Sequence, residues 1–213
     1  AGSQMEIKMI RVLTVAAALA ATAASMPAAA AEFSGFRAEL QGGWDQAKVG
    51  YTDALGFSYE KSHSGFGYGA EVGYDFPISE GVILGALGNI AGSTANAEDI
   101  LCDDNGACLL GRPIVNANLG FNFSLMARVG FKVADSTMLY GAGGYANQNI
   151  KYYATPVGGV TVEDSNSYGG FRLAAGVEQA FGESLYGKLE YRYSDYGSNL
   201  TTNQVWGGVG MRF

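Results

Sequence analysis

The feature that most constrains this chain is an alternation of apolar and polar residues, with a period of two, that recurs from Phe36 to the final residue, Phe213. Successive side chains of a β-strand point to opposite faces, so each alternating run predicts a strand with one apolar and one polar face. Eight such runs can be read along the chain. Each is about ten residues long, which is the length that a tilted strand needs to cross a bilayer.

The charges of these runs all lie on the polar face, which is rich in glycine, whereas the opposite face is uncharged and rich in aromatic residues. A barrel in water would carry its charges outside and its large apolar side chains inside. The reversed pattern places the uncharged face against lipid, where one charge at the midplane would cost about 2–4 kcal/mol. Hydrocarbon cannot satisfy an open sheet edge, so the sheet must close. The sequence therefore predicts an all-β fold, an eight-stranded antiparallel up-and-down transmembrane β-barrel, in preference to a soluble β-sandwich.

The charged face predicts what fills this barrel. An eight-stranded barrel is just wide enough inside for side chains to fill it, and mixed charges can offset one another's desolvation there. Seven basic and six acidic residues are therefore expected to form an ion network that plugs the lumen: Arg37, Glu39, Asp45, Glu71, Asp75, Arg128, Lys132, Arg172, Glu178, Lys188, Glu190, Arg192 and Arg212. Counting from the turns places Glu39, Glu71, Arg128, Lys188 and Glu190 at about the same depth.

The connections between the runs alternate in length. Short turns are expected at three places, 79–81, 134–136 and 182–184, and long loops at four, about 48–63, 93–114, 150–167 and 196–203. An even number of strands with short turns at one end and long loops at the other is typical of an outer-membrane barrel, with its long loops outside the cell.

The N-terminal segment predicts export. Lys8 and Arg11 precede the apolar run Val12–Ala24, and an Ala-x-Ala site ends at Ala31, which is the pattern of a cleaved secretory signal peptide. The expected division is residues 1–4 as a cloning scar, 5–31 as the signal peptide and 32–213 as the outer-membrane barrel domain. No later run reaches the roughly 18 apolar residues that a spanning helix needs.

Two features of the expected long loops suggest local chemistry. Cys102 and Cys108 would form a disulfide in an oxidising compartment, around a turn that contains Asp103 and Asp104. Those carboxylates could hold Ca²⁺, but an exposed acidic turn is the commoner case, so we expect neither a metal nor a cofactor. The net charge of −7 argues against a nucleic-acid partner.

The only histidine, His63, raises the alternative of an enzyme that modifies lipid A. It is flanked by Ser62 and Ser64, but sequence neighbours on a strand point to opposite faces, and no second cluster supplies an oxyanion hole. A solvated loop histidine is the simpler interpretation, so we expect no enzyme. Gly65, Gly67 and Gly69 precede no helix and are not a nucleotide-binding motif; they leave room for interior side chains.

The aromatic residues have two interpretations. Some lie near the expected strand ends, where interfacial girdles form: Trp44, Tyr74, Phe76, Phe131, Tyr193 and Phe213. Others lie in the expected long loops and could contact an extracellular ligand: Tyr51, Phe57, Tyr59, Tyr152 and Tyr153.

The end of the chain carries a family resemblance. The segment EQAFGESLYGKLEYRYSDYG, followed by QVWGGVGMRF, resembles the small eight-stranded outer-membrane β-barrel family, which includes opacity-type proteins and "porin family" surface proteins of Gram-negative bacteria. Its most specific parts are Lys188–Gly197 and the terminal Phe213, while Met211 stands where the family often has an aromatic residue. The resemblance implies that the barrel assembly machinery reads Phe213 and that the protein resides in the cell outer membrane.

The resemblance implies fold and location more closely than activity. We expect a structural or surface-exposed barrel, an adhesin or antigen, whose partners are outer-membrane lipid and an extracellular ligand or host surface. No oligomer is required. A narrow porin-like channel for small solutes is the main alternative, and a lipid A-modifying enzyme is a weaker one.

Overall fold

The structure is a computed structural model that describes residues 33–52, 58–94, 96–97, 114–155, 162–197 and 200–213. The described residues are almost entirely β-strand. The strands are β1 (Gly35–Thr52), β2 (Ser58–Ser79), β3 (Val82–Ser93), β4 (Asn96–Ala97), β5 (Ile114–Ala134), β6 (Thr137–Thr155), β7 (Val162–Phe181), β8 (Leu185–Asp195) and β9 (Leu200–Arg212). Within the described part of the chain, no helix is long and apolar enough to cross a membrane.

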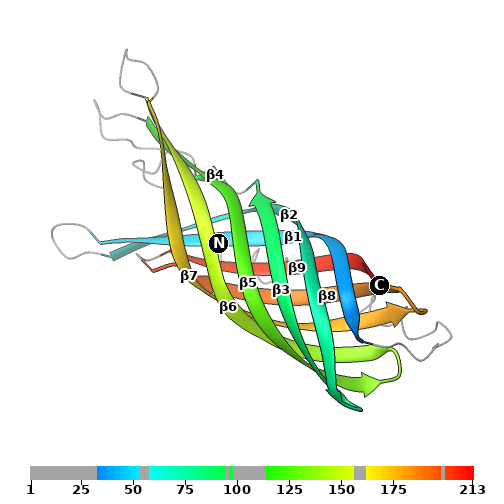
Figure 1. Ribbon diagram of the computed structural model, residues 1–213. Helices are drawn as coiled ribbons and strands as arrows, with labels where there is room; N and C mark the ends of the chain where they lie inside the picture. Colours follow the sequence, from blue (N-terminus) through cyan, green and yellow to red (C-terminus); the bar gives the residue numbers. More distant parts are fainter. Residues whose placement is uncertain (1–32, 53–57, 95, 98–113, 156–161, 198–199) are drawn as a thin grey trace, which may run out of the picture.

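The strands form one closed antiparallel barrel (Figure 1). The long strands pair in sequence order, with β3 pairing directly with β5, and β1 closes the sheet by pairing with β9. The two-residue strand β4 only adds to the edge of β5, so the wall itself has eight strands. The predicted eight-stranded up-and-down barrel is confirmed.

The strand lengths differ from the prediction. β3, β8 and β9 have 12, 11 and 13 residues, but β2, β5 and β7 have 22, 21 and 20. The expected loops at 48–63 and 150–167 were therefore largely wrong, because β1, β2, β6 and β7 continue into them. Backbone hydrogen bonding can extend a hairpin through polar residues. The apolar alternation used to delimit the strands detects only the part that faces lipid.

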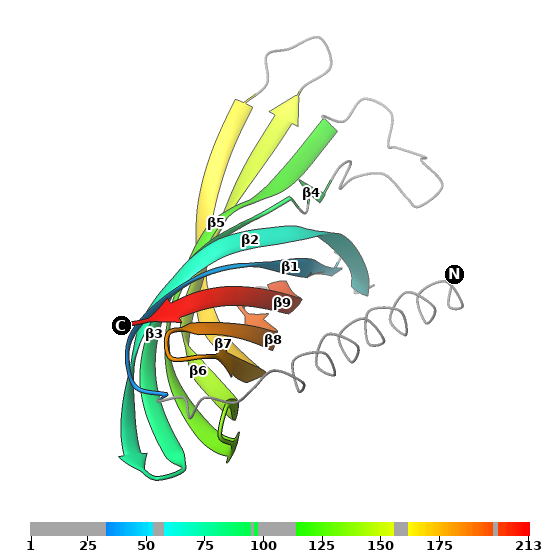
Figure 2. The same cartoon turned by 90° about the vertical axis from the view of Figure 1, so that its right-hand side faces the viewer.

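The two ends of the barrel are unlike. The short turns at 80–81, 135–136 and 182–184 lie together at one end, here named the turn end, and the long connections define the loop end. Figure 2 shows the loop-end parts of β5, β6 and β7 standing apart from β1, β2, β8 and β9.

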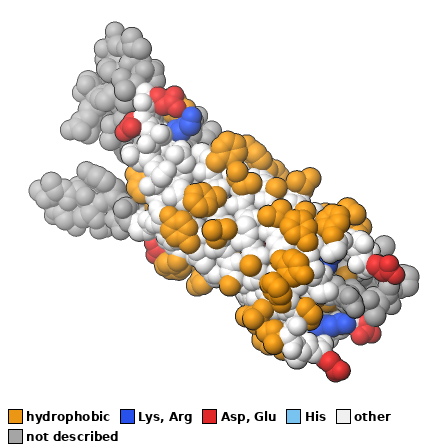
Figure 3. All heavy atoms as spheres, in the orientation of Figure 1, with side chains coloured by type: hydrophobic (Ala, Val, Ile, Leu, Met, Phe, Trp, Pro, Cys, Tyr) orange, Lys and Arg blue, Asp and Glu red, His pale blue; other side chains and the backbone are white. Residues whose placement is uncertain are grey.

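The outer wall is apolar. Leu40, Phe66, Leu125 and Val209 are 74, 59, 63 and 60% exposed, which is the exposure expected of side chains that face lipid. Figure 3 shows hydrophobic side chains spread over the middle of the wall, with charged side chains near the two ends. The interior is polar in its middle and apolar near both ends, where two clusters of buried residues lie.

The turn-end cluster contains a residue from outside the strands. Phe33 precedes β1 and packs on Ile83, Met138, Tyr140 and Ala180. The chain bends at Gly35, which has a φ of 94°, and a Cβ there would lie 2.5 Å from the carbonyl oxygen of Phe213. A side chain is disfavoured at this φ and has no room, so glycine lets the chain turn from the wall into the barrel.

Candidate functional site: the barrel lumen

Ten of the charged side chains expected in the lumen meet there in two layers. We name the turn-end ion layer (Asp75, Arg128, Glu178 and Arg212) and the central ion layer (Arg37, Glu39, Glu71, Lys188, Glu190 and Arg192) after their positions. Each of these side chains is at most 5% exposed. The layers contain equal numbers of acids and bases, so mutual attraction offsets the desolvation of each charge.

In the turn-end ion layer, each guanidinium contacts both carboxylates. Arg128 donates through Nε to Asp75 Oδ1 at 2.9 Å and through Nη1 to Glu178 Oε2 at 2.9 Å. Arg212 Nη2 lies 3.3 Å from Asp75 Oδ2 and also donates to Glu178. Arg128 and Asp75 meet across Gly85, which pairs with both residues, and a Cβ there would overlap the Asp75 carboxylate.

This position of Arg128 differs from the prediction. It was expected at the depth of Glu71 and Glu190, but it lies one layer closer to the turn end. The strands of a closed barrel are staggered, so a count of residues from each turn does not give a common depth. The position of the turn-end ion layer follows from the register of neighbouring strands, in which Gly85 pairs with Asp75 on one side and with Arg128 on the other.

Glu71 is at the centre of the central ion layer. Its carboxylate lies 2.7 Å from Arg37 Nη2, 3.0 Å from Lys188 Nζ and 3.4 Å from Arg192 Nη2. Lys188 Nζ is also 2.7 Å from Glu39 Oε1, and Arg192 donates to Glu190. Arg37 links the layers, with its Nε 3.7 Å from Asp75 Oδ2.

Buried aromatic residues complete the layers. Tyr140 donates to Glu190 at 2.6 Å and Tyr186 to Glu39 at 3.0 Å, while the Arg192 guanidinium lies 4.8 Å from the Trp206 ring centre. Arg212 lies 4.9 Å from the ring of Phe33, a contact that favours a cation over an aromatic face. Sequence reasoning did not assign these aromatics to the lumen. For Tyr186 the alternation phase was a usable signal, because this residue is in phase with Lys188 and Glu190.

Three charged residues expected in the network lie outside both layers. Among the described residues, the hydrogen bonds of Arg172 go to hydroxyl groups, at 2.8 Å to Ser194, 3.2 Å to Ser124 and 3.0 Å to Tyr196. The Asp45 carboxylate accepts hydrogen bonds from the side chains of Ser93 and Gln204. Lys132 is only partly buried, near the turn end.

The other candidate residues are dispersed. His63 lies in β2, paired with Ala47, and not in a loop as expected. Tyr51, Tyr59, Tyr152 and Tyr153 likewise lie in strands. Five further candidates lie outside the described residues: Phe57, Cys102, Asp103, Asp104 and Cys108. Among the residues that are described, no group of three or more His, Cys, Asp or Glu side chains could hold a metal ion.

The terminal Phe213 lies on the outer surface at the turn end. It is 74% exposed, its ring centre lies 6.1 Å from that of Phe36, and its backbone N–H donates to the Phe36 carbonyl at 2.9 Å. The other girdle candidates Trp44, Tyr74, Phe76 and Phe131 are also exposed on the wall, and Tyr193 is partly exposed.

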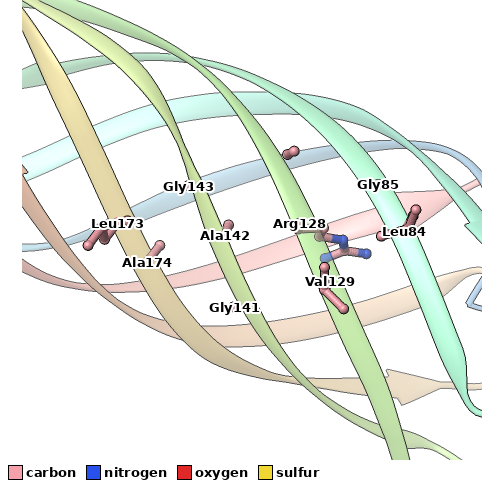
Figure 4. A pocket seen from close by; sticks show the side chains of 10 residues that line it. Leu84, Gly85, Arg128, Val129, Gly141, Ala142, Gly143, Leu173 and Ala174 are labelled. Atoms are coloured by element: carbon pink, nitrogen blue, oxygen red, sulfur yellow. The ribbon is translucent and has the colours of Figure 1, made fainter.

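A shallow groove of about 630 Å³ crosses the outer wall over β3, β5, β6 and β7 (Figure 4). Leu84, Val129 and Leu173 border it, and Gly141 and Gly143 leave its floor without side chains. It is apolar and holds no arrangement of nucleophile and base. The lumen is therefore the part of the barrel where polar chemistry is concentrated.

Comparisons with known proteins agree with this architecture. Residues 15–213 match a family model described as "outer membrane protein beta-barrel domain". The 25 kDa outer-membrane immunogenic protein of Brucella ovis is 26% identical over 171 residues, covering 80% of this chain and 72% of the relative. The 31 kDa outer-membrane immunogenic protein of Brucella melitensis is 27% identical over 143 residues, covering 66% of this chain and 58% of the relative. The crystal structure of Neisserial surface protein A has the same fold, with a TM-score of 0.52 and 16% identity, covering 84% of this chain and 98% of that chain.

Proposed function

The chain belongs to the outer membrane protein β-barrel domain family, and from this premise we propose that it is a surface-exposed structural barrel with a plugged lumen. It resides in the outer membrane, as its relatives do. In the proposed role, the two ion layers close the interior, and the loop end contacts an extracellular ligand or host surface, as in an adhesin or antigen.

The ion layers carry the first part of this proposal. A general porin conducts through a water-filled lumen whose lining charges face water. Here the charged side chains of both layers are buried, and each contacts a partner of opposite sign across the barrel axis or along the wall. Phe33 and its neighbours close the turn end below them. A hydrated ion would have to displace these contacts in order to pass.

The loop end supports the second part. Residues 163–167 of β7 are all exposed and polar. Lys151 on β6 lies 3.0 Å from Glu163, and this hydrogen bond and the charge of Glu163 raise the pKa of Lys151 above its usual value. Within the described part of the chain, β7 begins to pair with β8 only at Phe171, so residues 162–169 have no paired strand on that side. Strands that project in this way offer backbone groups and polar side chains to a partner.

Two measurements test the proposal separately. The refolded protein in a planar bilayer should show no stable conductance, and stable large steps would establish the channel alternative instead. For recognition, cells that express the protein should adhere to host cells better than cells lacking it. A variant in which Glu163, Asp164 and Asn166 of this exposed segment are changed to glycine or serine should lose that advantage while still assembling. Equal adhesion with and without the protein would refute a role in attachment.

A further inference from the structure

The lipid-facing wall is not filled evenly by side chains. The groove over β3, β5, β6 and β7 has a volume of about 630 Å³, within the range of small-molecule binding sites, about 300–1,000 Å³. Its floor lies at Gly141 and Gly143, and Leu84, Val129 and Leu173 border it (Figure 4). A hollow of this size in hydrocarbon must be occupied, because an empty one would forfeit the dispersion contacts of its lining.

Large side chains form a ridge along the loop-end side of the groove. Leu125, Tyr145 and Phe171 pair in register across β5, β6 and β7 and are 63, 49 and 48% exposed. Ala127 and Gly143 are the next outward pair toward the turn end, and they carry little or no side chain. The depth of the groove therefore comes from the contrast in side-chain size between two adjacent rows of the wall.

The turn-end side of the groove is lower on β3 than on its neighbours. Phe131 and Leu139 pair there across β5 and β6 and are 54 and 48% exposed. The partner of Phe131 on β3 is Val82, which is smaller and partly buried. Leu84 borders the groove two residues after β3 begins at Val82. The groove is therefore open toward the turn end along β3.

The position and backbone pairing of the groove limit what can occupy it. Exposed apolar side chains surround it, so it is continuous with the contact between the barrel wall and membrane lipid. Gly141 and Gly143 pair with β5 on one side and β7 on the other, so the floor offers no sheet edge to an added peptide strand. A second barrel is convex and would rest on the ridge without filling the groove. A flexible apolar chain meets all of these conditions.

We propose that the groove binds one acyl chain of a phospholipid and holds that lipid on the wall more tightly than the surrounding bilayer lipid. Apolar surfaces have no hydrophobic drive to associate inside a bilayer, so binding there depends on how closely groups pack. A groove contacts a chain on its floor and on both sides, whereas a convex wall contacts it on one side only. The opening along β3 faces the turn end, where the predicted topology places the periplasmic leaflet and its phospholipid.

Two outward glycines provide a matched pair for testing this site. Gly141 lies on the floor of the groove, and Gly207 lies on β9, outside its lining. A Cβ at Gly141 would have its nearest neighbour at 4.0 Å, and one at Gly207 at 3.8 Å, so both positions accept a side chain without overlap. Gly141→Leu therefore fills the groove, whereas Gly207→Leu adds the same side chain to another part of the wall.

Native mass spectrometry of the refolded protein counts the lipid that remains bound. The protein is refolded in vesicles of phosphatidylethanolamine, phosphatidylglycerol and lipid A and then extracted into detergent. Wild type and Gly207→Leu should retain one phospholipid per barrel. Gly141→Leu should lower the retained fraction at least about tenfold, because the leucine takes the place of the chain against the floor. Gel mobility before and after boiling identifies folded variants, and Ala127→Leu fills the same groove from β5 if Gly141→Leu does not fold.

The same spectra contain the results that would overturn the proposal. One is the absence of retained lipid in the wild type, and another is equal retention by Gly141→Leu and Gly207→Leu. Retention of lipid A in place of phospholipid would put the occupant in the other leaflet and would also contradict the proposal. A protein dimer that Gly141→Leu dissociates would show that a second copy of the chain covers the groove, which again refutes a lipid site.

Discussion

Truncating Glu71 provides the most direct test of the ion layers. Three bases contact its carboxylate, at 2.7 Å for Arg37, 3.0 Å for Lys188 and 3.4 Å for Arg192. Each charge-assisted hydrogen bond contributes about 1.5–3 kcal/mol, but partial rearrangement and entry of water reduce the sum. Removing one partner of a buried ion pair typically costs about 3–5 kcal/mol, because the remaining charge is buried without compensation. We expect Glu71→Ala to lower the free energy of unfolding by that amount.

The double variant Glu71→Ala with Lys188→Met separates charge imbalance from lost packing. It removes one acid and one base, so the central ion layer returns to equal numbers of each sign. It should recover a substantial part of the loss, giving a favourable coupling of at least about 1 kcal/mol between the two sites.

The assay is urea unfolding in lipid vesicles, followed by the gel mobility of folded and unfolded protein, with conductance measured on the same samples. Glu71→Gln is the matched variant of the same size, since it removes the charge and replaces one acceptor oxygen with an amide N–H donor. A cost below about 1 kcal/mol for Glu71→Ala, or additive effects of the two substitutions, would refute the charge-balance reasoning.

Three further predictions concern the barrel as a whole. The protein should migrate differently on gels before and after boiling, and circular dichroism of the barrel domain in detergent should be almost wholly β; substantial helix would contradict the fold. Protease added to intact cells should cut only in the connections between β1 and β2, β3 and β5, or β6 and β7, whereas cleavage at Asp135 or Glu183 would reverse the orientation. Gly85→Ala should lower the free energy of unfolding by about 1–3 kcal/mol in a urea titration, because the added methyl group would overpack against Asp75. Gly88→Ala is the control, since its Cβ would have its nearest neighbour at 3.6 Å. Equal effects of the two substitutions would show that space at Gly85 is unimportant.

The alternation of apolar and polar residues is enough to assign which side chains face the barrel interior and which face lipid. Alternation along a strand follows from covalent geometry, so Leu125 and Arg128 are assigned to opposite faces as soon as the strand and its phase are recognised. All charges of the strands lie on one face, which implies that the uncharged face lies against lipid. These two inferences were enough to predict a closed eight-stranded barrel. Even Tyr186 could have been placed inside from its phase alone.

Which charges meet, and where the polar interior ends, depends on the closed sheet as a whole. Arg128 pairs with Asp75 and Glu178 because the stagger of the closed barrel sets relative depth, and stagger is a property of the whole sheet rather than of any strand. The extension of β7 beyond the lipid-facing zone depends on backbone pairing with β6, which leaves no apolar signature. Phe33 enters the lumen because the chain bends at Gly35 towards a pocket formed by three other strands, a contact between residues far apart in the sequence that local alternation cannot encode.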